Sequence, residues 1–441
     1  MDFSWQHVLE FNDAQAAFDT FTDTFQQIFN LYFPLMTKKP NAKYSKIEPW
    51  MTWGLLKSRT TKLKLNQLFT RTPSLENKNK FTQYRNLYNK LIREAKKTHF
   101  HEKLTIYQGN AKKTWQSLFQ AILKNSKNRS SCTSLLVDND VVSDPSVIAD
   151  EFIQFFINAA PQIISDIHLS DKSPTGLLQQ NNNLFSLTNV PVTMTEVIET
   201  TRKLMDKKSP DDLGLTSFLL KKIIDLVVIP VHHILKLSFE NGVVPQQLKI
   251  ARVVPVHKAG DRLLMDNYRP ISLLPTFSKV MEKIVAERLT NFLNDNSLLS
   301  QWQFGFRTRH STIHPMMHFM NHVTDAFNSK QSSIAIFCDL RKAFDTCDHD
   351  ILLNKLAKYG VTGSELLWFK SYLSNRQQFV TINNSRSSLL EVRLGVPQGS
   401  ILGPLLFLIY INDLPNISFS FPYSLLMIPL YSYLTLISIL S

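Results

Sequence analysis

With 441 residues, 44% of them apolar, the chain is long enough for two or three globular domains with ordinary cores. Lysine and arginine outnumber acidic residues 49 to 36, and the net charge of +13 favours a polyanionic partner such as nucleic acid over an acidic small molecule. Cys132, Cys338 and Cys347 are too few and too scattered for a disulfide framework or a zinc site. We therefore expect a reducing intracellular compartment, nuclear or cytoplasmic, and the acidic start of the chain predicts no signal peptide.

The positive charge is concentrated near the N-terminus. From Lys38 to Arg129 there are 22 basic and 4 acidic residues, a net charge of +18. Apolar residues at helical spacing, with basic residues between them, predict a basic helical arm over residues 1–130. The arm could bind a polyanion, or it could be only the solvated face of a lysine-rich helix. Its aromatic residues could stack on bases or form a core, and we assign them no site role: Trp50, Trp53, Phe69, Tyr84, Tyr88 and Trp115.

Residues 131–245 are predicted to be a helical connector. A helix is expected at 146–159, and two more helical patterns run from Thr193 to Leu237 on either side of a turn-rich break, Lys207 to Gly214. No internal repeat is evident.

Downstream the pattern changes to mixed strands and helices. Residues 332–339 alternate as a strand, which puts the carboxylate of Asp339 at a strand end, and a helix at 350–359 follows. Residues 377–382 and 389–394 predict a hairpin, and 401–411 predict a buried helix. The predicted fold class is α+β.

An acid at a strand end is common and carries little information alone. Here it is one of four motifs that occur in order along the chain. They are Asn267-Tyr268-Arg269-Pro270-Ile271-Ser272-Leu273-Leu274-Pro275, Gln303-Phe304-Gly305-Phe306-Arg307, Asp339 to Asp345, and Gly395-Val396-Pro397-Gln398-Gly399-Ser400-Ile401-Leu402-Gly403-Pro404.

These segments resemble the fingers and palm of reverse transcriptases. The strings NYRPISLLP, KAFDTCDH, GVPQGSILGP and YINDLP are similar to those of non-LTR (long interspersed) retrotransposons of the Jockey-like kind. The resemblance covers about residues 246–415. It implies right-hand polymerase fingers and a partial palm, preceded by the mostly helical basic arm and the connector, with the thumb absent. It looks less like a group II intron maturase or a viral polymerase.

The chemistry that the resemblance implies is RNA-directed DNA synthesis, in which a primer 3′-hydroxyl attacks a deoxynucleoside triphosphate with two magnesium ions. The implied partners are an RNA template, a DNA primer and deoxynucleotides, with no membrane and no obligate protein partner. Asp339 would be the catalytic carboxylate and first metal ligand, and the backbone carbonyl of Leu340 would lie beside it.

Further residues match the family's binding positions. Phe344 would lie under the sugar and exclude a ribose 2′-hydroxyl, although a core phenylalanine is the plainer alternative. Lys258 and Arg269 would clamp the triphosphate, unless each simply forms a surface ion pair. Gln398 would offer an amide to the template and nucleotide pair, and Gly399 and Arg307 would contact nucleic acid. The glycines of that loop would allow close backbone approach.

The chain departs from the family after YINDLP. The family continues to Phe-Ala-Asp-Asp-Thr, whose aspartates complete the metal site, whereas residues 416–441 form an apolar tail. Codons for that string, read one base later, give Leu-Leu-Met-Ile-Pro, which is Leu425 to Pro429. We therefore hypothesise a frameshift and an inactive, truncated polymerase, and sequencing the coding DNA tests this. A non-catalytic nucleic-acid-binding remnant is the alternative, and a membrane-anchored tail is weakened by Pro422 and Pro429.

Overall fold

The computed structural model describes residues 4–34, 48–122, 132–165, 176, 178, 181–338, 340–417, 423–427 and 434–440. The chain divides into two compact units: unit 1 is Met1–Pro34 with Cys132–Ser441, and unit 2 is Leu35–Ser131. The structure therefore differs from the predicted arm of residues 1–130, because its first 34 residues belong to unit 1. Within the described ranges, no helix has the length and apolar character needed to cross a membrane.

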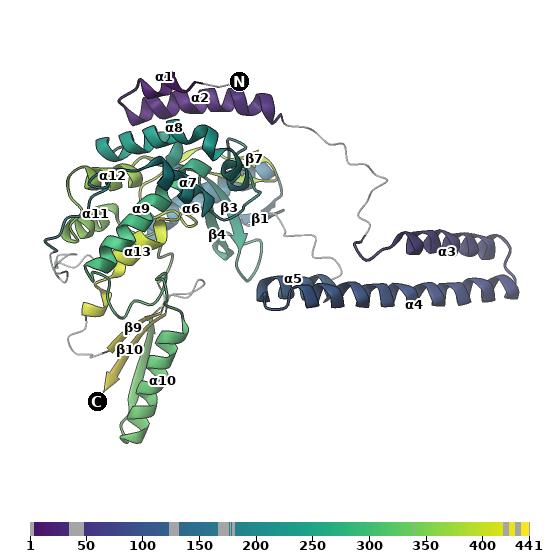
Figure 1. Ribbon diagram of the computed structural model, residues 1–441. Coiled ribbons are helices and arrows are strands. Elements are labelled where there is room, and N and C mark those ends of the chain that lie inside the picture. The colour runs from purple at the N-terminus through teal and green to yellow at the C-terminus, as the bar shows by residue number, and fades with distance from the viewer. Residues whose placement is uncertain are drawn as a thin grey trace. The chain divides into compact units, whose positions relative to one another are not determined.

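Unit 2 is a helical hairpin extended by a third helix, α3 (Trp53–Arg71), α4 (Leu75–Ile106) and α5 (Ala111–Ile122) (Figure 1). Thr52 and Ser74 cap α3 and α4 by accepting hydrogen bonds from backbone amides of the first turns. The two long helices meet along an aromatic seam. Phe69 stacks on Phe81 with ring centroids 6.4 Å apart, and the Ser58 and Tyr84 hydroxyls lie 2.9 Å apart.

The N-terminal helices of unit 1, α1 (Gln6–Leu9) and α2 (Ala14–Tyr32), pack on α8 (Ser217–Asn241). Phenylalanines of α2 recur every three or four residues, so they share one face. Phe21 and Phe25 meet the Phe277 ring edge-on at 5.2 and 5.5 Å. Because this face is buried in the main core, residues 1–34 are part of unit 1 and not of a basic arm.

A five-stranded sheet forms the second part of unit 1. Its order is β4-β3-β6-β7, and β8 also pairs with β6. The strands are β3 (Ile250–His257), β4 (Tyr268–Leu273), β6 (Arg376–Ile382), β7 (Ser385–Arg386) and β8 (Leu390–Val392). β3 runs antiparallel to β4 and parallel to β6. Helix α6 (Pro145–Ser165) covers one face, where Phe152 packs with Val253, Tyr268 and Val380.

The remaining elements surround the helical core or extend from it. They are β1 (Leu135–Val137), β2 (Asp140–Val142), α7 (Met194–Arg202), η2 (Gln246–Lys249), η3 (Met265–Asn267), α9 (Thr276–Asp295), α10 (Ile313–Asn328), α11 (His349–Lys358), α12 (Gly363–Leu373), α13 (Gly403–Ile411) and η4 (Leu414–Ile417). Trp368 of α12 is fully buried against Phe239 of α8, which shows how tightly this core is packed.

A separate three-stranded antiparallel sheet has the order β5-β10-β9, with β5 (Ser333–Cys338), β9 (Tyr423–Met427) and β10 (Leu434–Leu440) (Figure 1). Cys338 pairs with Thr435, and Thr435 pairs with Leu426 on its other side. β5 and β9 therefore end at the same edge of this sheet.

The predicted mixture of helices and strands is confirmed. β5 and α11 lie where the sequence placed a strand and a helix. The predicted hairpin of 377–382 and 389–394 is found as β6 paired antiparallel with β8, and the segment between them adds the short strand β7, after which Ser387 exchanges hydrogen bonds with Val380. The predicted helix at 401–411 begins only at Gly403, whose amide donates to the Ser400 hydroxyl at 2.8 Å.

Candidate functional site

The loop Gly395–Ser400 connects β8 to α13 and joins three of the four motifs. Its Val396 amide donates to the Phe344 carbonyl at 2.8 Å, and its Gly395 amide donates to the Cys347 carbonyl at 2.7 Å. On its other side, the Gln398 carbonyl accepts from the Ser272 amide of β4 at 2.8 Å. The loop thus ties β4 to the turn that follows β5.

Two glycines make this junction possible. Gly395 has a φ of +82°, and a Cβ there would lie 2.7 Å from the Phe344 carbonyl oxygen and from the Asp345 backbone. Gly399 has a φ of +123°, and its Cβ would lie 2.6 Å from the Ser272 carbonyl oxygen. At both positions φ is positive, and an added Cβ would overlap backbone atoms of another segment. Only glycine tolerates this combination. The close approach expected from the sequence is therefore found.

The fourth motif reaches the junction through Phe344. The half-buried Phe344 ring lies 4.9 Å from the Phe407 ring of α13 and meets the Phe306 ring edge-on at 6.1 Å. Phe407 is core, whereas Phe306 is exposed. One side of Phe344 therefore belongs to the core, as the plainer alternative expected, and its role in sugar selection stays a prediction.

Lys258 and Arg269 share one face of the β3–β4 hairpin. Arg269 lies opposite Val256 in the register, and directly opposed residues of an antiparallel pair point to the same face. Lys258 is two residues beyond Val256, so the period of a strand puts it on that face too. The opposite face carries Val253 and Tyr268, which are buried against α6. Lys258 lies just past the end of β3, and its amide donates to the Asn267 carbonyl at 2.8 Å, which continues the pairing. The two cations predicted to bind a triphosphate thus lie on the face opposite Val253 and Tyr268.

Arg307 lies apart from these cations. Its guanidinium donates to the Ser300 carbonyl at 2.8 Å and to the Gln303 carbonyl at 3.3 Å. Burial lowers the pKa of Arg307, and the side chain lines a cavity of about 510 Å³ beside Asn412. The observed contacts stabilise the local backbone, and the predicted contact with nucleic acid remains a prediction.

The predicted metal site is only partly described. Asp339 lies outside the described residues, while Leu340 is half-buried against the main core. Among the residues that the structure describes, no group of three or more His, Cys, Asp or Glu side chains could hold a metal ion. The described residues therefore do not by themselves fit a two-ion site.

Asp345 and Lys342 were not singled out from the sequence, although both belong to the KAFD string. Burial raises the pKa of Asp345 to about 6, and Lys342 acts in the opposite direction. Asp345 lines a cavity of about 380 Å³ together with Gln398 and Pro270. Lys342 has a φ of +50°, lies 4.4 Å from the centre of the Phe155 ring, and has a pKa lowered mainly by burial. The turn after β5 thus contains a lysine with a strained backbone conformation and a poorly solvated carboxyl group.

Glu282 of α9 was also missed. It is fully buried, and its carboxyl oxygens accept from the Tyr372 hydroxyl and the Ile401 amide, each at 2.7 Å. Burial raises its pKa, which these hydrogen bonds and Arg376 oppose. Since Ile401 follows Ser400, Glu282 holds the end of the loop that carries Gln398. Nothing in a single sequence distinguishes this glutamate from Glu287 of the same helix, which is partly exposed.

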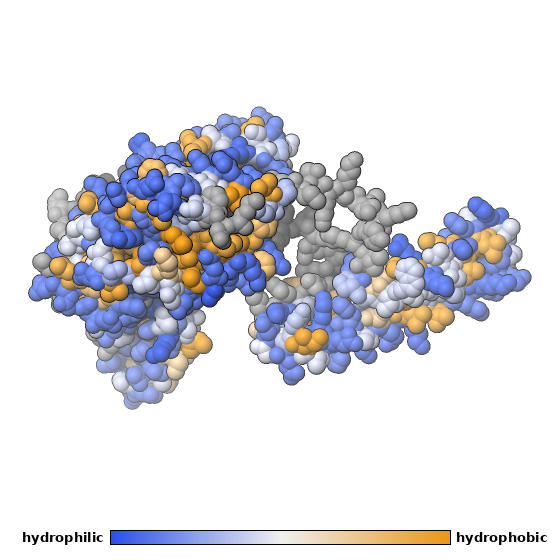
Figure 2. Space-filling model, turned by 45° about the horizontal axis from the view of Figure 1, so that its top comes forward, coloured by the Kyte–Doolittle hydropathy of each residue, from blue (hydrophilic) through white to orange (hydrophobic). Residues whose placement is uncertain are grey.

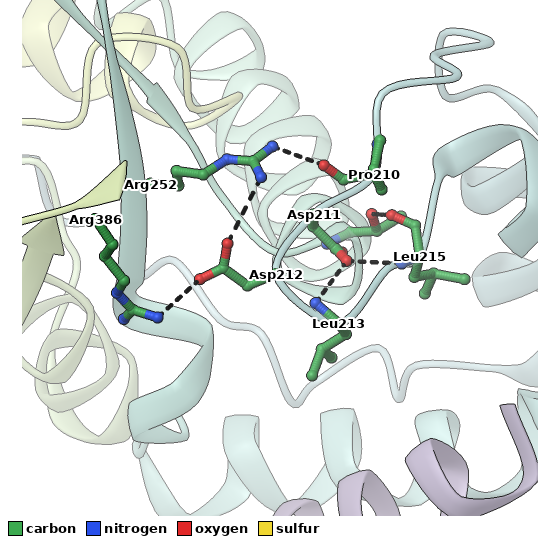
Figure 3. Close-up of polar contacts among 8 residues, drawn as sticks. Pro210, Asp211, Asp212, Leu213, Leu215, Arg252 and Arg386 are labelled. Atoms are coloured by element: carbon green, nitrogen blue, oxygen red, sulfur yellow. Dashed lines mark hydrogen bonds and ion pairs between the residues drawn. The ribbon is translucent and has the colours of Figure 1, made fainter. Parts of the chain in front are cut away.

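A second missed anchor is the turn-rich break before α8. The Asp211 carboxylate accepts from the amides of Leu213 and Leu215 at 3.1 and 2.9 Å and from the Thr276 amide of α9 at 2.7 Å. The neighbouring Asp212 faces Arg252 of β3 and Arg386 of β7 at 3.8 and 3.9 Å (Figure 3). The pair of aspartates thus connects the helical connector to α9 and to the sheet.

The YINDLP string is explained by buried polar contacts. Asp413 forms an ion pair with Lys355 of α11 at 2.5 Å. Asn412 accepts from the Ser300 amide and donates to the Leu298 carbonyl and the Tyr359 hydroxyl. These residues join the end of α13 to α11 and to the segment after α9, which is a structural role.

With the motifs assembled, comparison with known proteins becomes informative. Residues 256–427 match the family model described as "Reverse transcriptase (RNA-dependent DNA polymerase)". This part of the chain is therefore similar to a reverse transcriptase domain. Its relatives include "Probable RNA-directed DNA polymerase from transposon BS" of Drosophila melanogaster, 36% identical over 52% of this chain and 25% of the relative. "RNA-directed DNA polymerase from mobile element jockey" of the same species is 32% identical over 51% of this chain and 25% of its own length.

A more distant relative, "Transposon TX1 uncharacterized 149 kDa protein" of Xenopus laevis, is 28% identical over 66% of this chain and 22% of the relative. The chain thus spans about a quarter of the length of the curated relatives it matches. The predicted likeness to polymerases of Jockey-like elements is confirmed for the reverse transcriptase domain.

Proposed function

We propose that this chain derives from the RNA-directed DNA polymerase of a non-LTR retrotransposon, and that residues 246–415 form its fingers and part of its palm. An RNA template, a DNA primer and deoxynucleotides would be its ligands, inside the cell. The observation that carries the proposal is the junction at Gly395–Ser400, where the motif of residues 395–404 forms backbone hydrogen bonds with the motifs of residues 267–275 and 339–345.

The junction supports specific roles for its residues. Gln398 lines the 380 Å³ cavity, and its backbone carbonyl accepts a hydrogen bond from the Ser272 amide. Its side-chain amide therefore extends from a fixed backbone. Lys258 and Arg269 lie on one face of the β3–β4 hairpin, where two cations suit the charge of a triphosphate. The Phe344 ring packs against Phe407 of the core. A side chain that limits the space around a sugar needs to be held in place in this way.

The chemistry of the family requires two magnesium ions, which supply charge stabilisation for phosphoryl transfer. Asp339 and the Leu340 carbonyl are the ligands proposed from this chain. The apolar residues of β9 favour the second candidate function, a nucleic-acid-binding remnant without catalysis. β9 ends at Met427 at the same sheet edge as β5, where the family has paired aspartates and this chain has Leu425, Leu426 and Met427.

Primer extension tests both candidates. With RNA template, DNA primer, deoxynucleotides and Mg²⁺, we expect no extension by the natural chain. Replacing Leu426→Ala, Met427→Asp and Ile428→Asp should give extension that Asp339→Asn abolishes. Extension by the unaltered chain would overturn the proposed inactivity. If neither chain binds the deoxynucleotide complementary to the template more tightly than a mismatched one, the polymerase proposal fails.

A further inference from the structure

Unit 2 presents two stripes of basic side chains that face away from its own core. The α3 stripe consists of Lys57, Lys64 and Arg71, and all three are exposed. Residues seven apart on a helix lie only about 20° apart around the axis and about 10.5 Å apart along it. The seam residues Ser58 and Phe69 lie on the other side of α3, against α4.

The α4 stripe consists of Lys90, Arg93 and Lys97, which are also exposed and share one helix face by their spacing of three, four and seven. The seam residue Tyr88 is buried on the opposite side. Of the acidic residues of α4, Glu94 follows Lys90 by four positions and precedes Lys97 by three, so one carboxylate lies beside this stripe, whereas Glu76 and Glu102 lie nearer the two ends of the helix. The α4 stripe therefore keeps an excess of positive charge.

The charge of these stripes is not neutralised within the hairpin. α3 contains no acidic residue, and the one ion pair in the described part of unit 2 joins Lys80 to Glu76. In space-filling view the described atoms of the hairpin are mostly hydrophilic, with apolar patches between them (Figure 2). The like charges of the two stripes repel one another, and binding of a polyanion would reduce this repulsion.

Helix α5 adds an exposed aromatic pair. Trp115 and Phe119 are 60% and 55% exposed, with ring centroids 6.0 Å apart. By contrast, the aromatic residues Phe69, Tyr84 and Tyr88 are used in the seam, which confirms the core alternative for those three. The rings left open on α5 can stack on unpaired bases, which a duplex does not offer.

We propose that unit 2 binds single-stranded nucleic acid, with the α3 and α4 stripes on the phosphates and Trp115 and Phe119 on the bases. The α3 stripe also has exposed apolar neighbours, since Leu68 lies between Lys64 and Arg71 and Trp53 lies one turn before Lys57, whereas Thr60 and Gln67 are polar. An anionic membrane is disfavoured, because a membrane-binding helix needs a continuous apolar face separate from its cations, and here apolar and basic residues are mixed. The site is distinct from the reverse transcriptase domain and needs neither nucleotide nor metal.

The test is a salt titration of the full chain with a labelled oligouridine, in a chelating buffer without nucleotides. Neutralising Lys57→Gln, Lys64→Gln and Arg71→Gln should reduce the slope of log affinity against log salt by about 2, since each phosphate contact contributes about 0.7. At about 0.1 M salt the affinity should fall on the order of a hundredfold. The matched control, Arg202→Gln, Lys236→Gln and Lys370→Gln, removes the same charge from exposed positions of unit 1.

Equal losses in the variant and the control would show that only net charge matters and would overturn the proposal. So would an unchanged slope, or binding of phosphatidylserine vesicles in preference to the oligonucleotide. Trp115→Ala should weaken oligouridine binding roughly tenfold and leave duplex binding unchanged, whereas Ile106→Ala, at an exposed aliphatic residue, should change neither. Because no synthesis is measured, failure here is separate from failure of the polymerase proposal, which primer extension tests.

Discussion

The Gly395–Ser400 loop of unit 1 and the hairpin of unit 2 are stabilised by different kinds of contact. The loop has backbone amides and carbonyls bonded to β4 and to the turn after β5, with glycines where atoms come closest. The hairpin has a narrow side-chain seam and an outer surface rich in cations, with one ion pair among its described residues. A site that positions reacting groups needs the first arrangement. A surface that follows a flexible polyanion can function with the second.

The largest expected effect comes from adding one methyl group at the loop. Gly395→Ala should destabilise unit 1 by more than about 3 kcal/mol, because its Cβ would overlap backbone atoms that cannot move independently. Gly109→Ala in unit 2 is the matched control. Gly109 has a similar φ of +86° but no atom within 4 Å of the added Cβ, so only the left-handed backbone cost of about 1–2 kcal/mol applies. Hydrogen exchange, followed peptide by peptide, measures both. Equal losses would show that steric contact at the loop is unimportant.

Removing the buried anchor of the loop should have a somewhat smaller effect. Glu282→Ala leaves the Ile401 amide and the Tyr372 hydroxyl without their acceptor, at a cost of about 3 kcal/mol. Glu282→Gln keeps the volume and one acceptor and should cost less. Glu287→Ala, on the same helix but in an exposed ion pair with Lys283, should be nearly neutral. Urea unfolding compares the three variants, and a large loss at Glu287 would contradict this account.

Asp345 should make the stability of unit 1 depend on pH. Its pKa in the folded chain is about 6, above its ordinary value of 3.8, so the folded state binds more protons between these values. Stability should therefore fall as the pH rises from about 4 to about 6, by at most about 2 kcal/mol from this group. Asp345→Asn should remove that slope and stabilise the chain at neutral pH. Unfolding free energies measured from about pH 4 to about pH 6 test this prediction. If Asp345→Asn left the slope of stability against pH unchanged, Asp345 would be well solvated.

The smallest expected effect lies in the seam of unit 2. Tyr84→Phe removes its hydroxyl contact with Ser58 and should cost about 1 kcal/mol. Ser58→Ala should cost a similar amount, and the double variant should cost little more than either one, because both remove a single contact. Hydrogen exchange should change in α3 and α4 only. Additive losses would indicate that the two hydroxyls act separately.

The sequence predicted much of the reverse transcriptase domain because its information there is local and ordered. The alternation of residues 332–339 predicted β5, and the close approaches of Gly395 and Gly399 followed from their residue type. It did not predict that α2 packs in unit 1. The phenylalanine face of α2 needs an apolar partner, and only the fold shows that this partner is Phe277.

The sequence did not predict the residues that anchor the site, for a similar reason. Glu282 and Asp211 act through contacts with residues 119 and 65 positions away in the chain. A pattern of neighbours cannot record such distances. Conversely, Asn412 and Asp413 stood out in the YINDLP string, and the structure assigns them to buried links between helices.

By itself the sequence determined the likeness to reverse transcriptases, the excess of positive charge in residues 38–129 and the apolar string Leu425 to Pro429. These are properties of residue type and order, which folding does not alter. The tertiary structure decided which backbone atoms Gly395 and Gly399 meet, which aromatic rings of unit 2 are buried and which cations share a face. Those outcomes depend on long-range packing, because a side chain acquires its neighbours only when distant segments meet.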